Sequence, residues 1–97
     1  MDLQKLMRDA QKMQQNLSNI GQELDETEYT GTSNGVTIKV NGKSECLLVD
    51  IPEDMLTDRE MLQDVIMIAF NDATSKAAQD REQRLDEATQ NMALPGM

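Results

Sequence analysis

Residues 34–42 read NGVTIKVNG, and this stretch decides the fold. Between its ends, three apolar residues (Val36, Ile38, Val40) alternate with polar ones, which is the pattern of a half-buried strand. An Asn-Gly pair stands on either side. Each pair predicts a two-residue hairpin turn, because both turn positions require a positive φ. The stretch therefore predicts a central strand with an antiparallel neighbour on each side.

The flanking segments supply those two neighbours. Residues 27–33 are rich in Thr, and residues 44–51 carry an alternating apolar face. The apolar residues of that face are Leu47, Val49 and Ile51. Pro52 ends the third strand, because proline has no N–H to donate to a sheet. We expect a three-stranded antiparallel meander over residues 27–51.

A heptad pattern precedes the strands and predicts a long helix. Its apolar positions are spaced alternately three and four residues apart: Leu3, Leu6, Ala10, Met13, Leu17, Ile20 and Leu24. This spacing places a narrow apolar seam along one side of a helix over residues 2–25, as in coiled coils. The seam is suited to a second copy of the chain, although a helix of the same chain could fill it instead.

A second long helix is predicted over residues 57–91. Thr57 and Glu60 match a capping box, in which each side chain pairs with a backbone N–H at the helix start. Between residues 61 and 73 the helix is apolar on nearly every side, so one small sheet leaves part of it uncovered. A second subunit is the simplest cover. Beyond Ala78 the residues are mostly polar, and we expect this end to project into solvent.

The composition excludes most kinds of catalytic site. The chain has no His and a single Cys, so it offers no Ser-His-Asp or Cys-His arrangement and no ligand set for zinc. Its carboxylate clusters lack the ligand pattern of a calcium loop, and no glycine-rich loop could cradle a phosphate. We therefore expect no enzyme activity, no metal, no cofactor and no small-molecule substrate.

Charge and hydropathy bound the cellular context. Eighteen acidic and nine basic residues give a net charge of −9, which opposes attraction to nucleic acid and to anionic membranes. The single Cys46 cannot form an internal disulfide, and residues 2–12 are too charged for a secretory signal. The longest purely apolar run, residues 65–70, is too short to span a bilayer. These features predict a cytoplasmic protein without a membrane partner.

The basic residues are placed unevenly. Two groups of three lie at helical spacing: Lys5, Arg8 and Lys12 on the first helix, and Lys76, Arg81 and Arg84 on the projecting end of the second. A homodimer would present each stripe twice and so offer several phosphate contacts. Base reading is not expected, because stacking aromatics and a recognition-helix motif are absent. Alternatively, these residues are only the solvated faces of amphipathic helices.

Several strings of residues, in the same order along the chain, resemble the YbaB/EbfC family of bacterial nucleoid-associated proteins. They are LMRDAQKMQ (6–14), VTIKVNG (36–42), VDI (49–51), EMLQD (60–64) and FNDA (70–73). The resemblance implies an α+β fold with a long helix, a three-stranded antiparallel meander and a long helix, in an intertwined homodimer with projecting helical arms. It also implies binding to duplex DNA with little sequence preference and association with the nucleoid.

We therefore predict one domain over residues 1–97: a helix over 1–25, strands over 27–51, a helix over 57–91 and a flexible tail over 92–97. The predicted DNA contacts are Lys5, Arg8, Lys12, Lys76, Arg81 and Arg84. Within this set, Arg8 matches a position that is usually basic in the family. The predicted dimer contacts are Leu6, Ala10, Met13, Leu17, Leu62, Ile66 and Phe70. The second hypothesis is an acidic dimeric adaptor that docks a basic protein and does not bind DNA.

Overall fold

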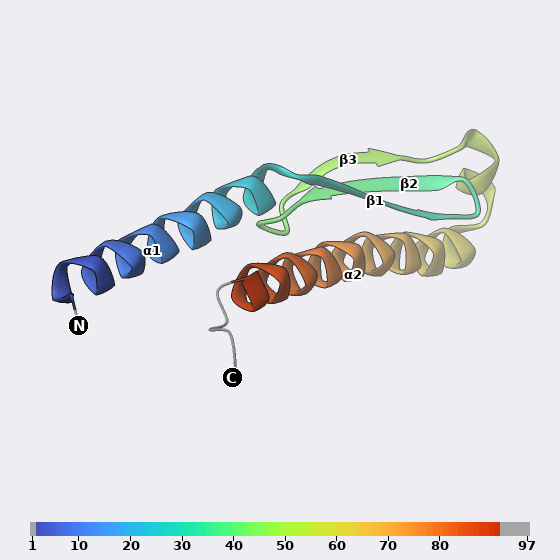
Figure 1. The fold of residues 1–97 in the computed structure, drawn as a ribbon. Helices are drawn as coiled ribbons and strands as arrows, with labels where there is room; N and C mark the ends of the chain where they lie inside the picture. Colours follow the sequence, from blue (N-terminus) through green and yellow to red (C-terminus); the bar gives the residue numbers. More distant parts are fainter. Residues whose placement is uncertain (1, 92–97) are drawn as a thin grey trace.

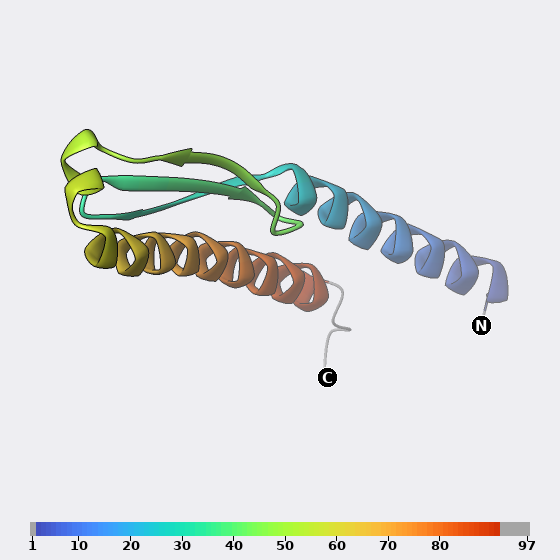
Figure 2. The ribbon, with the colours of Figure 1, turned by 180° about the vertical axis from the view of Figure 1, so that it is seen from behind.

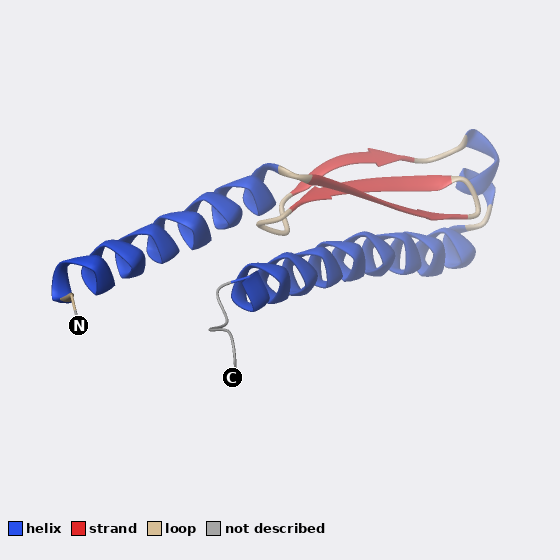
Figure 3. Cartoon of the chain, in the orientation of Figure 1, coloured by secondary structure: helices blue, strands red, loops and turns tan. Residues whose placement is uncertain are grey.

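The computed structural model describes residues 2–91 and confirms the predicted α+β architecture. The elements follow one another as helix α1 (Leu3–Glu26), strands β1 (Glu28–Ser33), β2 (Val36–Asn41) and β3 (Cys46–Asp50), the 3-10 helix η1 (Glu53–Thr57) and helix α2 (Arg59–Asn91). The strands form one antiparallel sheet in the order β1-β2-β3 (Figure 3). The tail predicted over 92–97 lies outside the described residues.

The molecule has two layers, because α2 lies along one face of the sheet (Figures 1 and 2). Alternate residues of β2 are buried against the helix, as the alternating pattern predicts: Val36, Ile38 and Val40. The helix meets them with small residues at every fourth position: Val65, Ala69, Ala73 and Ala77. Residues four apart lie on one face of a helix, so these side chains form a flat stripe on which the sheet rests.

The two layers approach each other closely at Gly31 in β1. A Cβ built on this residue would overlap the carbonyl oxygen of Ala69 and stand 2.5 Å from the backbone nitrogen of Ala73. Glycine is therefore needed here because the strand backbone lies directly against the helix backbone.

The first Asn-Gly turn forms as predicted, and the second does not. Asn34 and Gly35 both have positive φ, at 47° and 87°, as a two-residue type I′ turn requires. After β2, the N–H of Ser44 instead donates to the carbonyl oxygen of Asn41 (3.0 Å), and Ser44 takes the left-handed conformation at φ 66°. This is a longer loop with a bulge at its end. The prediction of a two-residue turn was wrong because the side chain of Asn41 forms hydrogen bonds that stabilise a longer loop.

The Asn41 side chain stabilises this second loop. Its Oδ1 atom accepts hydrogen bonds from the backbone N–H groups of Lys43 (2.9 Å) and Glu45 (3.0 Å). Such an Asx turn replaces the backbone turn that the sequence pair suggested. Gly42 serves the packing instead, since a Cβ there would collide with the carbonyl oxygen of Leu24.

The predicted capping box at Thr57 is also wrong. The Thr57 hydroxyl donates to the carbonyl oxygen of Asp54 within η1 (3.0 Å). The carboxylate of Asp58 accepts from the N–H of Met61 instead (3.1 Å), and α2 begins one residue later. Because η1 holds Thr57, the next residue takes the N-cap position, where Asp is equally favoured.

Helix α1 leaves the body of the molecule as an arm, which we define as residues 3–16, all of them exposed. Its inner end packs on α2 and β2, and Leu24 is fully buried there. The molecule is accordingly elongated, with extents of 70 × 24 × 14 Å (Figure 1). Within the chain, α2 covers only the inner end of the predicted seam. Leu3 and Leu6 at the outer end remain 72% and 51% exposed.

Candidate nucleic-acid interface

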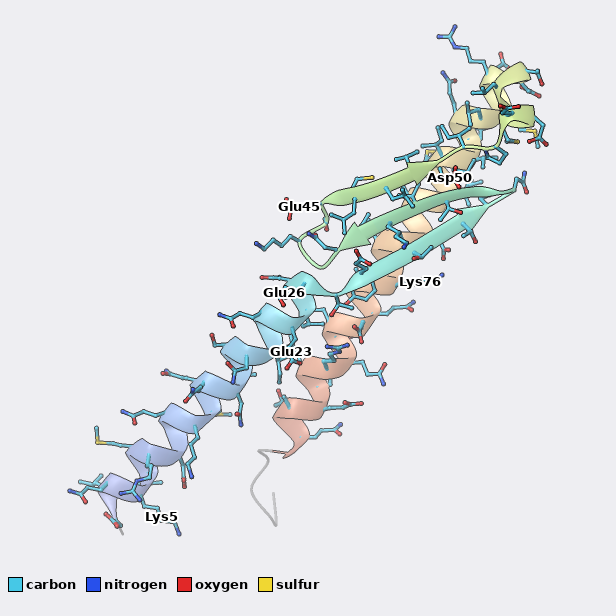
Figure 4. All side chains as sticks on the ribbon, turned by 90° about the horizontal axis from the view of Figure 1, so that it is seen from above. Lys5, Glu23, Glu26, Glu45, Asp50 and Lys76 are labelled. Atoms are coloured by element: carbon cyan, nitrogen blue, oxygen red, sulfur yellow. The ribbon has the colours of Figure 1, made fainter. Side chains whose placement is uncertain are left out.

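The basic stripe of the arm consists of Lys5, Arg8 and Lys12. At 3.6 residues per turn these side chains share one side of α1, roughly 130° around the axis from the apolar seam. None of the ion pairs formed within residues 2–91 involves them. Figure 4 shows Lys5 near the outer end of the arm, far from the sheet. The stripe can therefore meet an anionic partner without first releasing a carboxylate.

Lys76 occupies a different environment, beside β1 (Figure 4). Its Nζ donates to the carbonyl oxygen of Thr30 (2.9 Å) and lies 3.3 Å from the Asp72 carboxylate. Asp72 in turn accepts from the backbone N–H of Thr32 (3.3 Å). Lys76 and Asp72 thus attach α2 to the outer edge of the sheet.

Arg81 and Arg84 lie at the junction between α1 and α2. The Nη2 atom of Arg81 is 3.0 Å from the Asp25 carboxylate and 3.1 Å from the carbonyl oxygen of Gly42. The prediction that this end of α2 projects into solvent is therefore wrong for Arg81 and Arg84, although Glu82, Gln83 and Glu87 beside them are exposed. The two arginines face carboxylate and carbonyl groups from segments distant in sequence, which a helical pattern alone does not reveal.

Tyr29 joins the same network and was not singled out by the sequence. Its side chain is buried, and its hydroxyl donates to the Asp80 carboxylate (2.7 Å). The second oxygen of Asp80 accepts from Nε of Arg84 (3.2 Å). Burial raises the pKa of Tyr29 above its ordinary value of 10.0, and the negative charge of Asp80 raises it further. The one signal available in sequence was that Tyr29 is the only Tyr in the chain.

The predicted dimer contacts divide into two groups. On the arm, Leu6, Ala10 and Met13 are exposed, and Leu17 is half-buried. On α2, Phe70 is exposed, whereas Leu62 and Ile66 pack partly against the chain's own core. Leu6, Ala10, Met13 and Phe70 thus keep exposed apolar surface, whereas Leu17, Leu62 and Ile66 are already half-buried within the chain.

Other apolar residues are exposed that were not among the predicted dimer contacts. On β3 and α2 they are Leu47, Leu48, Val49, Met61, Met67 and Ile68. Among residues 2–91, α2 contacts β1 and β2 but not β3. The predicted third strand is therefore an edge strand whose apolar face has no helix beneath it.

Two other kinds of site, a membrane span and a metal centre, are not found in the described part of the chain. Within residues 2–91, neither helix carries an apolar stretch of membrane-spanning length. The same residues hold no group of His, Cys, Asp and Glu side chains placed for a metal ion. The exposed basic stripe remains the feature with the clearest binding chemistry.

Comparison with known proteins identifies relatives across nearly the whole chain. The model of the YbaB/EbfC DNA-binding family matches residues 1–92. A nucleoid-associated protein of Xylella fastidiosa strain Temecula1 is 41% identical over 96 residues, which are 97% of this chain and 91% of that protein. A nucleoid-associated protein of Xanthomonas axonopodis pv. citri is 42% identical over the same shares of the two chains.

The fold has a counterpart among solved structures. The crystal structure of an uncharacterized protein from Helicobacter pylori superposes with a TM-score of 0.75 at 26% identity, covering 90% of this chain and 96% of that one. The family and the names of the relatives describe nucleoid-associated DNA-binding proteins rather than enzymes. With the fold, the exposed basic stripe and a family match over residues 1–92, the chain belongs to the YbaB/EbfC family of DNA-binding proteins.

Proposed function

We propose that this protein binds duplex DNA as a homodimer, mainly through phosphate contacts from its arms, with little sequence specificity, and that it associates with the nucleoid. The observation that carries the proposal is the basic stripe of Lys5, Arg8 and Lys12 on a projecting helix, outside the ion pairs of the body. The two bacterial relatives named as nucleoid-associated proteins support the cellular assignment.

The charge distribution supports the arm as the DNA-binding element in spite of the net charge of −9. The arm contains three basic residues and one acidic residue, Asp9, whereas the rest of the chain contains six basic and seventeen acidic residues. A phosphate backbone is attracted to the arm and repelled by the body. We therefore expect DNA to lie along the arms rather than across the sheet.

Weak sequence preference follows from the side chains that the arm offers. It carries no Tyr, Phe or Trp on which a base could stack, and its charged groups are long and flexible. Contacts from Lys and Arg to phosphate fix position but carry no direct sequence information. The stripe from Lys5 to Lys12 is about 10 Å long, so each arm can reach two or three phosphates of one strand.

The homodimer explains the apolar surface that the chain leaves uncovered. Val49 of β3 is the register partner of Ile38, so both side chains point to the α2 side of the sheet. Ile38 is buried by α2, and Val49 is 50% exposed. We propose that α2 of a second copy lies beneath β3, beside the exposed Phe70 of the first. A two-fold axis would give both chains the same cover.

The test is a low-salt titration of non-specific duplex DNA with two charge-matched variants. R8E/K12E reverses two charges on the arm, and K39E/R59E reverses two charges on the body. Phosphate contacts from the arm predict that R8E/K12E loses most of its affinity and that K39E/R59E stays close to the original protein. Equal reductions in affinity for both variants would mean that only net charge matters and would refute an arm site.

The adaptor hypothesis is favoured by one specific feature. A hollow of about 520 Å³ lies between the inner end of α1 and the β2–β3 loop, and its lining holds three carboxylates, those of Asp25, Glu26 and Glu28, against one basic side chain, Lys43. Such a surface attracts cations, and a basic peptide is a suitable probe. Absence of DNA retention at low salt, together with oligolysine binding that E26Q/E28Q weakens, would select the adaptor over the DNA-binding protein.

A further inference from the structure

The junction between the arm and the body is assembled from segments distant in sequence. Leu24, in the last turn of α1, is fully buried. Its carbonyl oxygen lies so close to Gly42 that no side chain fits between the helix and the β2–β3 loop. The C-terminal end of α1 is closed by Thr27, whose backbone N–H donates to the carbonyl oxygens of Glu23 (3.0 Å) and Leu24 (3.2 Å). The direction of α1 is thus set within a few residues.

Arg81 connects the three segments that meet there. From α2, its guanidinium donates to the carboxylate of Asp25 on α1 (3.0 Å) and to the carbonyl oxygen of Gly42 in the loop (3.1 Å). Planar guanidinium groups hold two acceptors in a fixed geometry, which a single point charge does not. Arg84, also on α2, adds a longer contact to the carboxylate of Glu23 on α1 (4.0 Å).

We infer that Arg81, together with Asp25, is a positioning residue that fixes the direction of the arm, and that it is not a DNA contact. The consequence for DNA binding rests on the proposed function. Lys5 lies twenty residues before Asp25, which is a lever of about 30 Å along a helix. A rotation of about 10° at the junction therefore displaces Lys5 by about 5 Å, enough to separate it from a phosphate.

The two possible roles of Arg81 make opposite predictions for Asp25. If Arg81 contacted phosphate, removing the Asp25 charge would release the Arg81 guanidinium from its ion pair and make this acidic protein less negative. Binding to DNA would then become stronger. If the pair positions the arm, the same change loosens the junction and weakens binding, because ordering the arm then opposes association. The sign of the effect at Asp25 therefore separates the roles.

The first experiment measures affinity for a non-specific duplex over a range of salt concentrations, with R8Q as the reference variant that removes a charge from the stripe. We expect R81Q and D25N each to weaken binding by roughly threefold or more at low salt without changing the salt slope. R8Q should reduce the slope by about 0.9 for each phosphate that Arg8 neutralises. The double variant R81Q/D25N should bind no more weakly than either single variant, since both changes break the same interaction. Tighter binding by D25N, or a slope for R81Q reduced as in R8Q, would overturn the inference.

The second experiment needs no DNA, and so it tests the junction even if the protein proves not to bind DNA. Spin labels are attached at Gln11→Cys on the arm and Ser75→Cys on α2 in a Cys46→Ser background. The labelled protein is mixed with an excess of unlabelled protein, so that most dimers carry labels on one chain only. The measured distance is then the one between the two labels of a single chain. R81Q should broaden the distance distribution, and K76Q, which removes an ion pair away from the junction, should leave it unchanged. Equal widths for R81Q and the parent protein would refute the positioning role.

Discussion

The hydroxyl of Tyr29 donates a 2.7 Å hydrogen bond to the carboxylate of Asp80, joining β1 to α2 across 51 residues of sequence. Asp80 uses its other oxygen for Arg84, four residues along the same helix. Tyr29 itself is buried against the core. The pair thus links the apolar centre of the molecule to the polar junction from which the arm extends.

The Tyr29–Asp80 hydrogen bond should be visible in stability measurements. Tyr29→Phe keeps the ring and removes the hydroxyl, so the free energy of unfolding should fall by about 1 kcal/mol. Urea unfolding at pH 8 followed by circular dichroism measures this difference. Thr89→Val, which removes a hydroxyl bonded only within α2, is the control and should cost less. An unchanged midpoint for Tyr29→Phe would contradict the prediction.

The raised pKa of Tyr29 also predicts a pH dependence. Because the folded protein favours the protonated hydroxyl, its stabilising effect is complete below pH 10.0, the ordinary pKa, and declines as pH rises above that value. The unfolding free energies of the original protein and of Tyr29→Phe should therefore converge over the pH range above 10.0. Curves that stay parallel over this range would show that the folded and unfolded tyrosines titrate alike.

The close contact at Gly31 predicts a strong effect from a single methyl group. Gly31→Ala must push β1 away from the backbone of Ala69 and Ala73, which should cost about 3 kcal/mol. Gly21→Ala is the matched control, since a Cβ there meets nothing within 4 Å. In a helix interior this control should stabilise the fold by up to about 1 kcal/mol. Thermal unfolding of both variants checks the opposite signs.

The exposed seam predicts that the affinity of the two copies for each other depends on Leu6 and not on the adjacent Met7. Leu6→Gln places a polar group in the seam and should weaken the dimer by about 2 kcal/mol or more, because the apolar side chain is removed from both copies. Met7→Gln lies off the seam and should have little effect. Sedimentation equilibrium of the two variants makes the comparison at constant net charge. A stable monomer of the original protein at micromolar concentration would contradict the dimer altogether.

The basic stripe predicts a specific salt dependence. A dimer with three basic residues on each arm can neutralise up to six phosphates, which gives a slope of about −5 in a plot of log affinity against log salt. Changing Lys5, Arg8 and Lys12 together to Glu should abolish the low-salt gel shift and leave the dimer intact. A normal shift by this triple variant would exclude the stripe as the site.

The sequence predicted the parts of this fold that depend on local periodicity. The alternation in 36–40 and the heptad spacing of α1 both correspond to observed elements, and the Asn34-Gly35 turn has the expected backbone. Each of these signals lies within one continuous segment of the chain. Interactions between residues close in sequence determine these elements, and contacts with distant segments do not alter them.

The failures are of two kinds, one local and one between segments distant in sequence. Asp58 rather than Thr57 caps α2 because η1 precedes it. Arg81 binds Asp25 across 56 residues of sequence, so its partner becomes visible only when α1 and α2 are side by side. A basic residue at helical spacing looks the same whether it faces solvent or a carboxylate. This is why the sequence grouped Arg81 and Arg84 with the residues of the arm and did not predict the junction.

The isolation of the arm leaves residues 3–16 with little stability of their own, since isolated helices shorter than about 12 to 15 residues are marginal in water. If a second copy fills the seam as proposed, pairing supplies the missing free energy, and the helix of the arm is less stable in the separated chain than in the assembled protein. Lys5, Arg8 and Lys12 are aligned on one side only while that helix persists. Dilution of the protein would then weaken its anion-binding surface without any change in covalent structure. In the cell, the concentration of protein able to bind DNA would rise more steeply than the total concentration of the protein.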